Sequence, residues 1–459
     1  MATSVSGELL YIGIDVGGTK IQASLVREPG DVMARKRAVT PRTGGASKVM
    51  VAVERLIDGL MREEKVTTDD VLAIGIAVPG VVDPELGRVV VTPNMSLTGA
   101  MLGPRLENRY KLPVALGNDC NLGALGENWL GAARGASSAF GVFVGTGIGG
   151  GFVRGNRLWC GYRQQAGEIG HMTISLGGPK CACGNLGCLE ALASRTAIER
   201  RIRQAVAAGR KTLLTKLLGG KLGIIRSGAL KEALARRDRL VTKVLSEASE
   251  VLGAACVSVF HVLDPEVIVL GGGVIEACGD FMLPIIQEVV RTRQLPAARE
   301  GGGVFLSALG DDAVVLGAVA EARMLVGRSP FKKKYASTPE YATVKVTSRG
   351  EISVSGKVSP GDAIIRVSGK VRPREQEHVR ELYGTSHRIG TEEVAGVCKG
   401  GPEVLFVGTG RSARRELTAE AASYLRRRAI EVHVLPTGRA VEMYNRCARR
   451  KAALLERVG

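Results

Sequence analysis

One histidine and three cysteines lie close together near the middle of this 459-residue chain. They are His171, Cys181, Cys183 and Cys188, and the three cysteines fall within eight consecutive positions. One nitrogen and three sulfur donors form the closed tetrahedral set that is typical of structural zinc. The spacing therefore predicts a structural Zn²⁺ site, with reduced, unliganded cysteines as the alternative.

Two carboxylates, Glu168 and Glu190, flank these four candidate ligands. A metal that joins the two segments would bring both carboxylates to one place, where they can bind the hydroxyl groups of a sugar. If one ring nitrogen of His171 binds the metal, the other must carry the proton and becomes a fixed donor toward a substrate hydroxyl.

A third acid, Asp119, follows Asn118 at the predicted end of a strand and start of a helix. Either residue suits a helix N-cap. A carboxylate at this place can also act as the general base that accepts the proton of an attacking hydroxyl. Considered together with the glycine turns described next, Asp119 is interpreted as a catalytic base.

Two segments repeat the pattern of a strand, a glycine-rich turn and a second strand. In the first, Asp15 would meet Mg²⁺ through water, and Thr19 and Lys20 would add a hydroxyl and a positive charge at a terminal phosphate. A single turn of this kind is usually a plain hairpin, but the pair favours phosphate binding. A third glycine pair lies between a strand and a helix, where a nucleotide can approach the backbone. The candidate phosphate and nucleotide residues are Asp15, Gly17, Gly18, Thr19, Lys20, Gly145, Thr146, Gly147, Gly272 and Gly273.

Hydrophobic periodicity predicts the elements that must position these groups. The repeated strand–turn–strand unit indicates two similar lobes that face each other across a cleft. A final helix over 312–326 would have Asp312 as its N-cap. Strands are predicted at 9–14, 21–26, 71–78, 114–116, 140–144 and 267–270, and helices at 49–61, 119–130, 191–208, 213–218 and 230–262.

Composition sets outer bounds on the function. No apolar run approaches the roughly 18 residues that span a bilayer, and residues 1–10 lack the pattern of a signal peptide, so we expect a cytoplasmic protein. Nine cysteines in so long a chain do not form a disulfide scaffold. The net charge is +18, and two thirds of it falls after Gly327. Nucleic acid could bind such a region, but a solvated, arginine-rich surface is the favoured interpretation.

The composition changes again towards the end of the chain. Residues 328–341 contain Pro330, three consecutive lysines and Pro339, which is the composition of a linker. Short alternating strands follow, at 342–347, 352–358 and 363–367, and then a strand at 404–407 with helix and strand after it. Residues 342–459 are therefore predicted to form a separate small α/β domain.

Taken together, the motifs resemble those of the ROK family (repressors, open reading frames, sugar kinases), and among its members most closely the bacterial ATP-dependent glucokinases. The resemblance covers roughly residues 9–326, and the combination of motifs is highly specific. The segments that carry it are 15–20 (DVGGTK), 117–121 (GNDCN), 145–151 (GTGIGGG), 167–171 (GEIGH) and 181–190 (CACGNLGCLE).

The resemblance implies a two-lobed, actin-like (ribonuclease-H-like) α/β sugar kinase that closes over its substrates and forms homodimers. Lobe one would comprise about 1–120 plus 312–327, and lobe two about 121–311. The implied reaction is ATP-dependent phosphorylation of a hexose, most simply glucose, at its 6-hydroxyl. The implied roles are Asp119 as base; Asn118, Glu168, His171 and Glu190 as sugar contacts; His171, Cys181, Cys183 and Cys188 as zinc ligands; the first two glycine turns at the ATP phosphates; and Gly272 and Gly273 near adenosine.

Several alternatives stay open at this point. The loop after Pro93-Asn94 lacks a tryptophan that many family members have, which leaves the sugar-side wall and the exact sugar open. Glu168, His171 and Glu190 suit any ring with neighbouring hydroxyls, so N-acetylmannosamine, N-acetylglucosamine or fructose could replace glucose. Polyphosphate is a separate alternative to ATP as the phosphoryl donor. A sugar-sensing repressor would need a helix-turn-helix before the first strand, and only about eight residues precede it. Residues 404–410, 429–435 and 437–445 resemble a small α/β domain of unknown activity that is also seen in an assembly factor of respiratory complex I.

Overall fold

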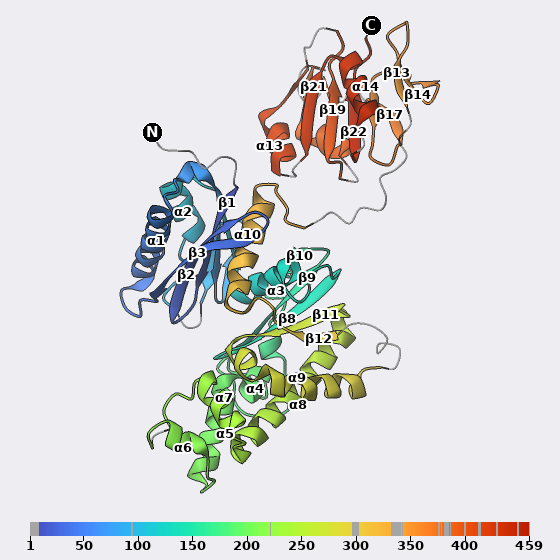
Figure 1. Ribbon diagram of the computed structural model, residues 1–459. Helices are drawn as coiled ribbons and strands as arrows, with labels where there is room; N and C mark the ends of the chain where they lie inside the picture. The colour runs from blue at the N-terminus through green and yellow to red at the C-terminus, as the bar shows by residue number, and fades with distance from the viewer. Residues whose placement is uncertain are drawn as a thin grey trace. The chain divides into compact units, whose positions relative to one another are not determined.

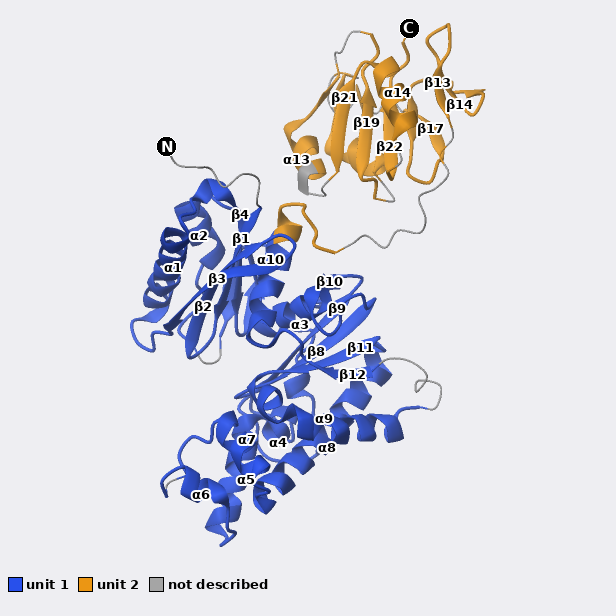
Figure 2. Ribbon diagram, in the orientation of Figure 1, with its two compact units in different colours: residues 1–322 blue, residues 323–459 orange. Residues whose placement is uncertain are grey.

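The chain divides into two compact units, residues 1–322 and 323–459 (Figure 2). No described helix is long and apolar enough to cross a membrane. The Pro93-Asn94 pair and most of the expected linker lie outside the described residues. The computed structural model describes residues 9–92, 95–220, 222–295, 303–331, 341, 343–374, 377, 379–380, 385, 387–398, 401–411, 415–427, 430–447 and 449–458.

The first lobe of unit 1 is built on a five-stranded sheet in the order β3-β2-β1-β4-β7. Helices α1 (Gly45–Glu64) and α2 (Leu102–Tyr110) cover one face, and α10 (Ala313–Leu325) covers the other (Figure 1). Gly13 and Gly75 face α10, where an added Cβ would lie 2.7 Å from Val315 and 2.0 Å from the carbonyl oxygen of Ala318. The strands are β1 Leu10–Val16, β2 Lys20–Arg27, β3 Asp31–Val39, β4 Val71–Val78 and β7 Val114–Asn118, with a hairpin of β5 Val81–Asp83 and β6 Arg88–Val91 beside them.

The second lobe repeats this plan with a sheet in the order β10-β9-β8-β11-β12. The hairpins β1–β2 and β8–β9 both enclose a glycine turn, as the repeat predicted. Helix α3 (Asp119–Leu130) packs on β8 and β9, and the remaining helices share one large core with the sheet. The elements are β8 Ser138–Val144, β9 Ile148–Arg154, β10 Arg157–Leu158, β11 Val267–Gly271, β12 Gly303–Leu306, α4 Leu189–Ala193, α5 Arg195–Ala207, α6 Leu213–Leu217, α7 Ser227–Ala235, α8 Arg239–Leu263 and α9 Gly273–Arg293.

Three helix predictions were wrong in detail. The helix predicted over 230–262 is interrupted, because Arg237 has a positive φ of 59° and Asp238 caps α8 by accepting a 2.9 Å hydrogen bond from the amide of Val241. The helix predicted over 191–208 restarts at Ser194, which caps α5. Asp312 is not placed as the predicted cap: it ends a 3₁₀ turn, and its carboxylate pairs with Arg35.

The buried carboxylate of Glu127, in α3, accepts hydrogen bonds from both segments that connect the two sheets. It accepts hydrogen bonds from the amide of Ala132 (2.7 Å) just after α3, and from the Ser307 hydroxyl (2.5 Å) and the Leu309 amide (3.0 Å) between β12 and α10. Four donors, with the Ala308 amide at 3.2 Å, compensate the cost of removing this charge from water.

Unit 2 is a smaller α/β domain around a mixed sheet in the order β17-β16-β22-β19-β21. Strand β19 runs parallel to both of its neighbours, and the side chains of Phe406 and Leu405 point to opposite faces. Helix α14 packs on the Phe406 face, and α12 and α13 pack on the Leu405 face. The elements are β13 Val344–Val346, β14 Ile352–Val354, β15 Lys357–Val358, β16 Ala363–Ile365, β17 Val371–Pro373, β18 Arg388–Ile389, α12 Thr391–Val397, β19 Val404–Gly408, β20 Glu416–Leu417, α13 Ala419–Arg427, β21 Glu431–Leu435, α14 Thr437–Arg446 and β22 Lys451–Leu455.

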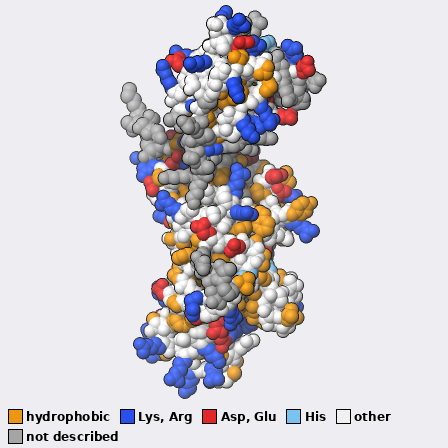
Figure 3. Space-filling view, turned by 90° about the vertical axis from the view of Figure 1, so that its right-hand side faces the viewer, with side chains coloured by type: hydrophobic (Ala, Val, Ile, Leu, Met, Phe, Trp, Pro, Cys, Tyr) orange, Lys and Arg blue, Asp and Glu red, His pale blue; other side chains and the backbone are white. Residues whose placement is uncertain are grey.

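Figure 3 shows how charged side chains are placed on one face of the molecule. On the face seen in Figure 3, Lys and Arg side chains form several separate clusters with acidic and hydrophobic side chains between them.

Candidate active site

The sequence left open whether Asn118 or Asp119 caps the helix and whether Asp119 is free to act as a base. The junction between β7 and α3 distinguishes these two roles. Asn118 is the N-cap: its side-chain oxygen accepts a 3.0 Å hydrogen bond from the amide of Asn121, and its side-chain nitrogen donates to the carbonyl of Gly80 at 3.0 Å. The Asp119 carboxylate is not used for capping and accepts a 2.8 Å hydrogen bond from the amide of Cys120. Asp119 is therefore oriented by the start of α3 and remains available for chemistry.

Four carboxylates from separate parts of the chain influence one another here. Burial raises the pKa of Asp119. Burial also raises the pKa of Asp15 to about 7, with the negative charge of Asp119 adding to the effect. Burial raises the pKa of Glu168 in the same way; His171 opposes this, while Asp119 and Glu190 reinforce it. Like charges act on each other only at short range in a partly buried site, so the fold brings these four acids together.

Replacing Asp15 with asparagine should raise the melting temperature of unit 1 at pH 8 in the absence of Mg²⁺. The folded chain keeps the Asp15 proton up to about pH 7, whereas the reference pKa is 3.8. Folding therefore loses stability as the pH rises between these values, and the loss is complete above pH 7. The gain should be about 2–4 °C for each kcal/mol recovered, measured by differential scanning fluorimetry.

The same substitution should have a much smaller effect near pH 4, where both states of the wild-type chain hold the proton. Asp280, an exposed residue of α9, provides a matched Asp→Asn control that should change the melting temperature little at either pH. An equal gain at pH 4 and pH 8 would contradict the raised pKa of Asp15.

The four candidate metal ligands also converge. The ligand atoms of His171, Cys181, Cys183 and Cys188 all lie within 4.8 Å of one another. Nδ1 of His171 is 3.8 Å from Sγ of Cys181, and the sulfurs of Cys183 and Cys188 are 3.7 Å apart. A tetrahedron with Zn–S bonds of about 2.3 Å has edges of about 3.8 Å. The two printed pairs match this edge, and the whole donor set, within 4.8 Å, is compatible with zinc.

The backbone around these ligands requires glycine at one position. Gly187 has a φ of 70°, and an added Cβ would lie 1.7 Å from the carbonyl oxygen of Ser175. Just beyond Cys188, Glu190 opens α4; one of its oxygens lies 3.8 Å from Sγ of Cys181 and the other accepts a 2.9 Å hydrogen bond from the amide of Ile148. Glu190 thus connects the cysteine cluster to the second glycine turn.

The first glycine turn is closed by a 3.0 Å hydrogen bond from the amide of Gly17 to the carbonyl of Lys20, and Gly18 and Thr19 are exposed at its tip. The Lys20 ammonium is bound by Asp311, with 3.0 Å between Nζ and Oδ2. Asp311 also pairs with Arg37. The sequence did not predict this ion pair, since its two residues are far apart in the chain.

The second and third glycine sites adjoin each other. An added Cβ on Gly272, whose φ is 86°, would lie 2.7 Å from the amide nitrogen of Val144, the last residue before the second turn. Helix α9 starts at Gly273 without a side-chain cap, which leaves its first amides free for a ligand. In the second turn, the amide of Gly145 donates to Gly147 at 2.9 Å, and the hydroxyl of Thr146 accepts a 2.8 Å hydrogen bond from Arg195.

Arg195 and Cys120 also contact residues of this site, and no sequence motif predicted either of them. The Ser194 cap would have placed Arg195 at a helix start directly after the cysteine cluster. Cys120 follows the predicted base immediately, and its amide contact to Asp119 is a consequence of the helix start there.

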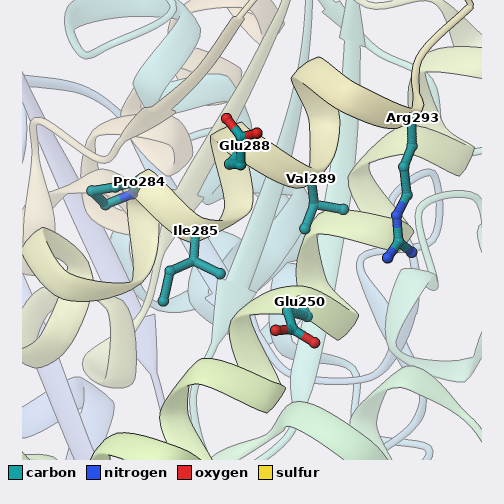
Figure 4. Close-up of a pocket in the computed structure, with 6 residues that line it drawn as sticks. All are labelled: Glu250, Pro284, Ile285, Glu288, Val289 and Arg293. Carbon is teal, nitrogen blue, oxygen red and sulfur yellow. The ribbon is translucent and has the colours of Figure 1, made fainter.

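A surface depression of about 460 Å³ between α8 and α9 contains none of the predicted site residues (Figure 4). Its lining residues are Glu250, Pro284, Ile285, Glu288, Val289 and Arg293.

Comparison with known proteins relates this geometry to a family. The family model described as "ROK family" matches residues 11–324. The chain belongs to the ROK family. A second model, of proteins of unknown function (DUF498/DUF598), matches residues 344–455 in unit 2.

Relatives of the ROK part include both enzymes and regulators. The chain is 33% identical over 308 residues to a glucokinase of Halalkalibacterium halodurans, which covers 67% of this chain and 93% of that protein. It is 32% identical over 321 residues to a glucokinase of Thermotoga maritima (70% and 99%). A putative xylose repressor of Caldicellulosiruptor sp. is 30% identical over 311 residues (68% and 77%).

Solved structures of the ROK family share this fold. A ROK glucokinase from Streptomyces griseus, solved with glucose and AMPPNP, is 31% identical with a TM-score of 0.58, covering 68% of this chain and 99% of that one. A ROK hexokinase from Thermus thermophilus is 32% identical with a TM-score of 0.58, covering 69% and 98%. The two-lobed ROK kinase fold expected from the motifs is therefore confirmed.

Proposed function

We propose that this ROK protein transfers the terminal phosphoryl group of ATP to the 6-hydroxyl of a hexose, and that the hexose is glucose. The observation that carries the proposal is the position of Asp119: its carboxylate is released from capping by Asn118, oriented by the Cys120 amide, and placed among three other acids. The glucokinase relatives, which match over nearly their whole length, support the same activity.

In the proposed reaction each of these side chains has a role. Glu168 and Glu190 accept hydrogen bonds from sugar hydroxyls, and Asn118 borders the same space. Asp119 accepts the proton of the 6-hydroxyl while that oxygen forms a bond to the γ-phosphorus and the bond to the β-phosphate oxygen breaks, which releases ADP. The raised pKa of Asp119 improves its match to this proton and thus suits a general base.

The zinc site would support sugar binding from outside the reaction. If Nδ1 of His171, which faces Sγ of Cys181, binds the metal, Nε2 would carry the ring proton and would donate to the sugar. Zn²⁺ at His171, Cys181, Cys183 and Cys188 would fix that ring and, through Cys188, the start of α4 with Glu190. Its contribution would be structural, because these four protein ligands would fill all four positions.

The nucleotide would lie along the three glycine sites. The amides of the first two turns face the phosphates, with Thr19 and Lys20 in the first and Thr146 in the second. Gly272 and Gly273 border adenosine at the uncapped start of α9. Asp15 would hold Mg²⁺ through water, and that ion supplies neutralisation of phosphate charge when bound.

A coupled assay of ADP release over a panel of sugars tests the substrate. We expect kcat/KM for glucose to exceed that for N-acetylmannosamine, N-acetylglucosamine and fructose by at least about tenfold, a difference of roughly 1.4 kcal/mol in transition-state binding. A higher value for another sugar would replace glucose in the proposal. Turnover with polyphosphate but not with ATP would contradict the donor.

A sugar-sensing repressor is the second candidate, supported by the xylose repressor relative. A repressor would bind sugar without releasing ADP, and it would bind DNA in a salt-dependent way. A kinase would release ADP in the presence of sugar and would not bind DNA. As a kinase that uses ATP and free hexose, the protein would act in the cytoplasm. Sedimentation velocity would test the expected homodimer.

A further inference from the structure

An arginine that no motif predicts lies against the second glycine turn. Arg195 is the first residue of α5, and its backbone amide donates to the carbonyl of Gly145 at 3.0 Å. Its guanidinium donates to the hydroxyl of Thr146 at 2.8 Å. The next residue, Thr196, donates its hydroxyl to the carbonyl of Thr146 at 2.8 Å. The start of α5 and the turn are thus one rigid piece that presents a positive charge.

A neighbouring carboxylate sets the direction of this guanidinium. Glu199, one helical turn later and buried, pairs with Nη1 of Arg195, while Nη2 reaches Thr146. The side chain of Arg195 remains 20% exposed. A guanidinium carries five donors in a fixed plane, so it can keep both contacts and still bind phosphate oxygens.

The proposed site needs a positively charged side chain near the phosphates. Four acidic side chains, those of Asp15, Asp119, Glu168 and Glu190, gather at the proposed sugar and Mg²⁺ positions, and in their ionised forms they would repel a nucleoside triphosphate. Lys20 at the first turn is already paired with Asp311. Phosphoryl transfer depends mainly on positioning and on neutralising charge at the transferred group.

We propose that Arg195 binds the β- and γ-phosphates of ATP from the second glycine turn, and so supplies from lobe two the positive charge that the transferred phosphoryl group needs. This inference rests on the proposed kinase function. Arginine is suited to the task because it binds phosphate oxygens in pairs, with charge-assisted hydrogen bonds.

Calorimetric binding of AMPPNP, ADP and AMP to the full-length chain tests the proposal without turnover. Arg195→Met should weaken AMPPNP binding about 10- to 100-fold and ADP binding less, and should leave AMP binding unchanged, because only the longer nucleotides reach the guanidinium. Arg195→Lys should recover part of the loss. Arg203 is a matched control: it pairs with the same Glu199 one helical turn further on, and its second contact is to Gly223, so Arg203→Met should bind AMPPNP as the wild type does.

Two results would overturn the proposal: unchanged AMPPNP affinity in Arg195→Met, or equal losses for AMPPNP and AMP, which would mean that the side chain only maintains the turn. If Arg195→Met does not fold, Arg195→Gln, which can still donate to Thr146 but has no charge, is measured in the same way. Failure of the wild-type chain to bind AMPPNP would instead refute the kinase function itself.

Discussion

Replacing Asp119 with asparagine is expected to lower kcat by about 10²- to 10⁴-fold, the usual contribution of a positioned general base. The amide cannot accept the proton of the 6-hydroxyl, but it has nearly the same shape and can still accept the hydrogen bond from the Cys120 amide. Glucose binding, followed by calorimetry, should therefore change by less than about tenfold, and the zinc content should not change.

Two outcomes would contradict the assignment of Asp119. Turnover within tenfold of wild type would show that another group accepts the proton. Loss of glucose binding together with turnover would show that Asp119 holds the sugar rather than activates it. Asp280→Asn, an exposed substitution in α9, is the matched control and should leave kcat unchanged.

Replacing Cys183 with alanine is expected to release the metal and to weaken glucose binding at least about tenfold. Cys183 is exposed, so its removal leaves the core intact, but three ligands hold zinc less tightly than four. Without the metal, His171 and the start of α4 lose their common anchor, and the two sugar contacts on them lose their fixed positions. Zinc content by mass spectrometry and glucose affinity by calorimetry should fall together.

The control for this substitution is Cys256→Ala, in the buried face of α8. It removes a thiol from the core and should lower the melting temperature while zinc content and glucose affinity stay at their wild-type levels. If Cys183→Ala loses its zinc but binds glucose normally, the metal does not organise the sugar site. If it keeps a full equivalent of zinc, Cys183 is not a ligand.

Local patterns predicted the parts of this structure that local rules determine. Alternating apolar residues around glycine predicted the hairpins β1–β2 and β8–β9, and the apolar run 71–78 predicted β4. The cysteine spacing predicted a cluster whose donor atoms do converge. These features depend on residues that are close in sequence.

Contacts between distant segments were beyond such patterns. Asp238 caps α8 and also accepts hydrogen bonds from Thr212 and Leu213, so the break in the predicted helix depends on a loop about 25 residues earlier. The pairing of Lys20 with Asp311 depends on the return of the chain to lobe one at α10. Amphipathic periodicity carries no information about either partner.

The buried carboxylate of Glu127 has a consequence for motion. Because it binds both connections between the lobes, we expect the two connections to move together, so that the lobes rotate about this point rather than slide past each other. A closing movement on sugar binding would then reach the glycine turns that face the nucleotide as a rotation about this shared point. The precision of phosphate placement would then depend on a side chain that touches neither substrate.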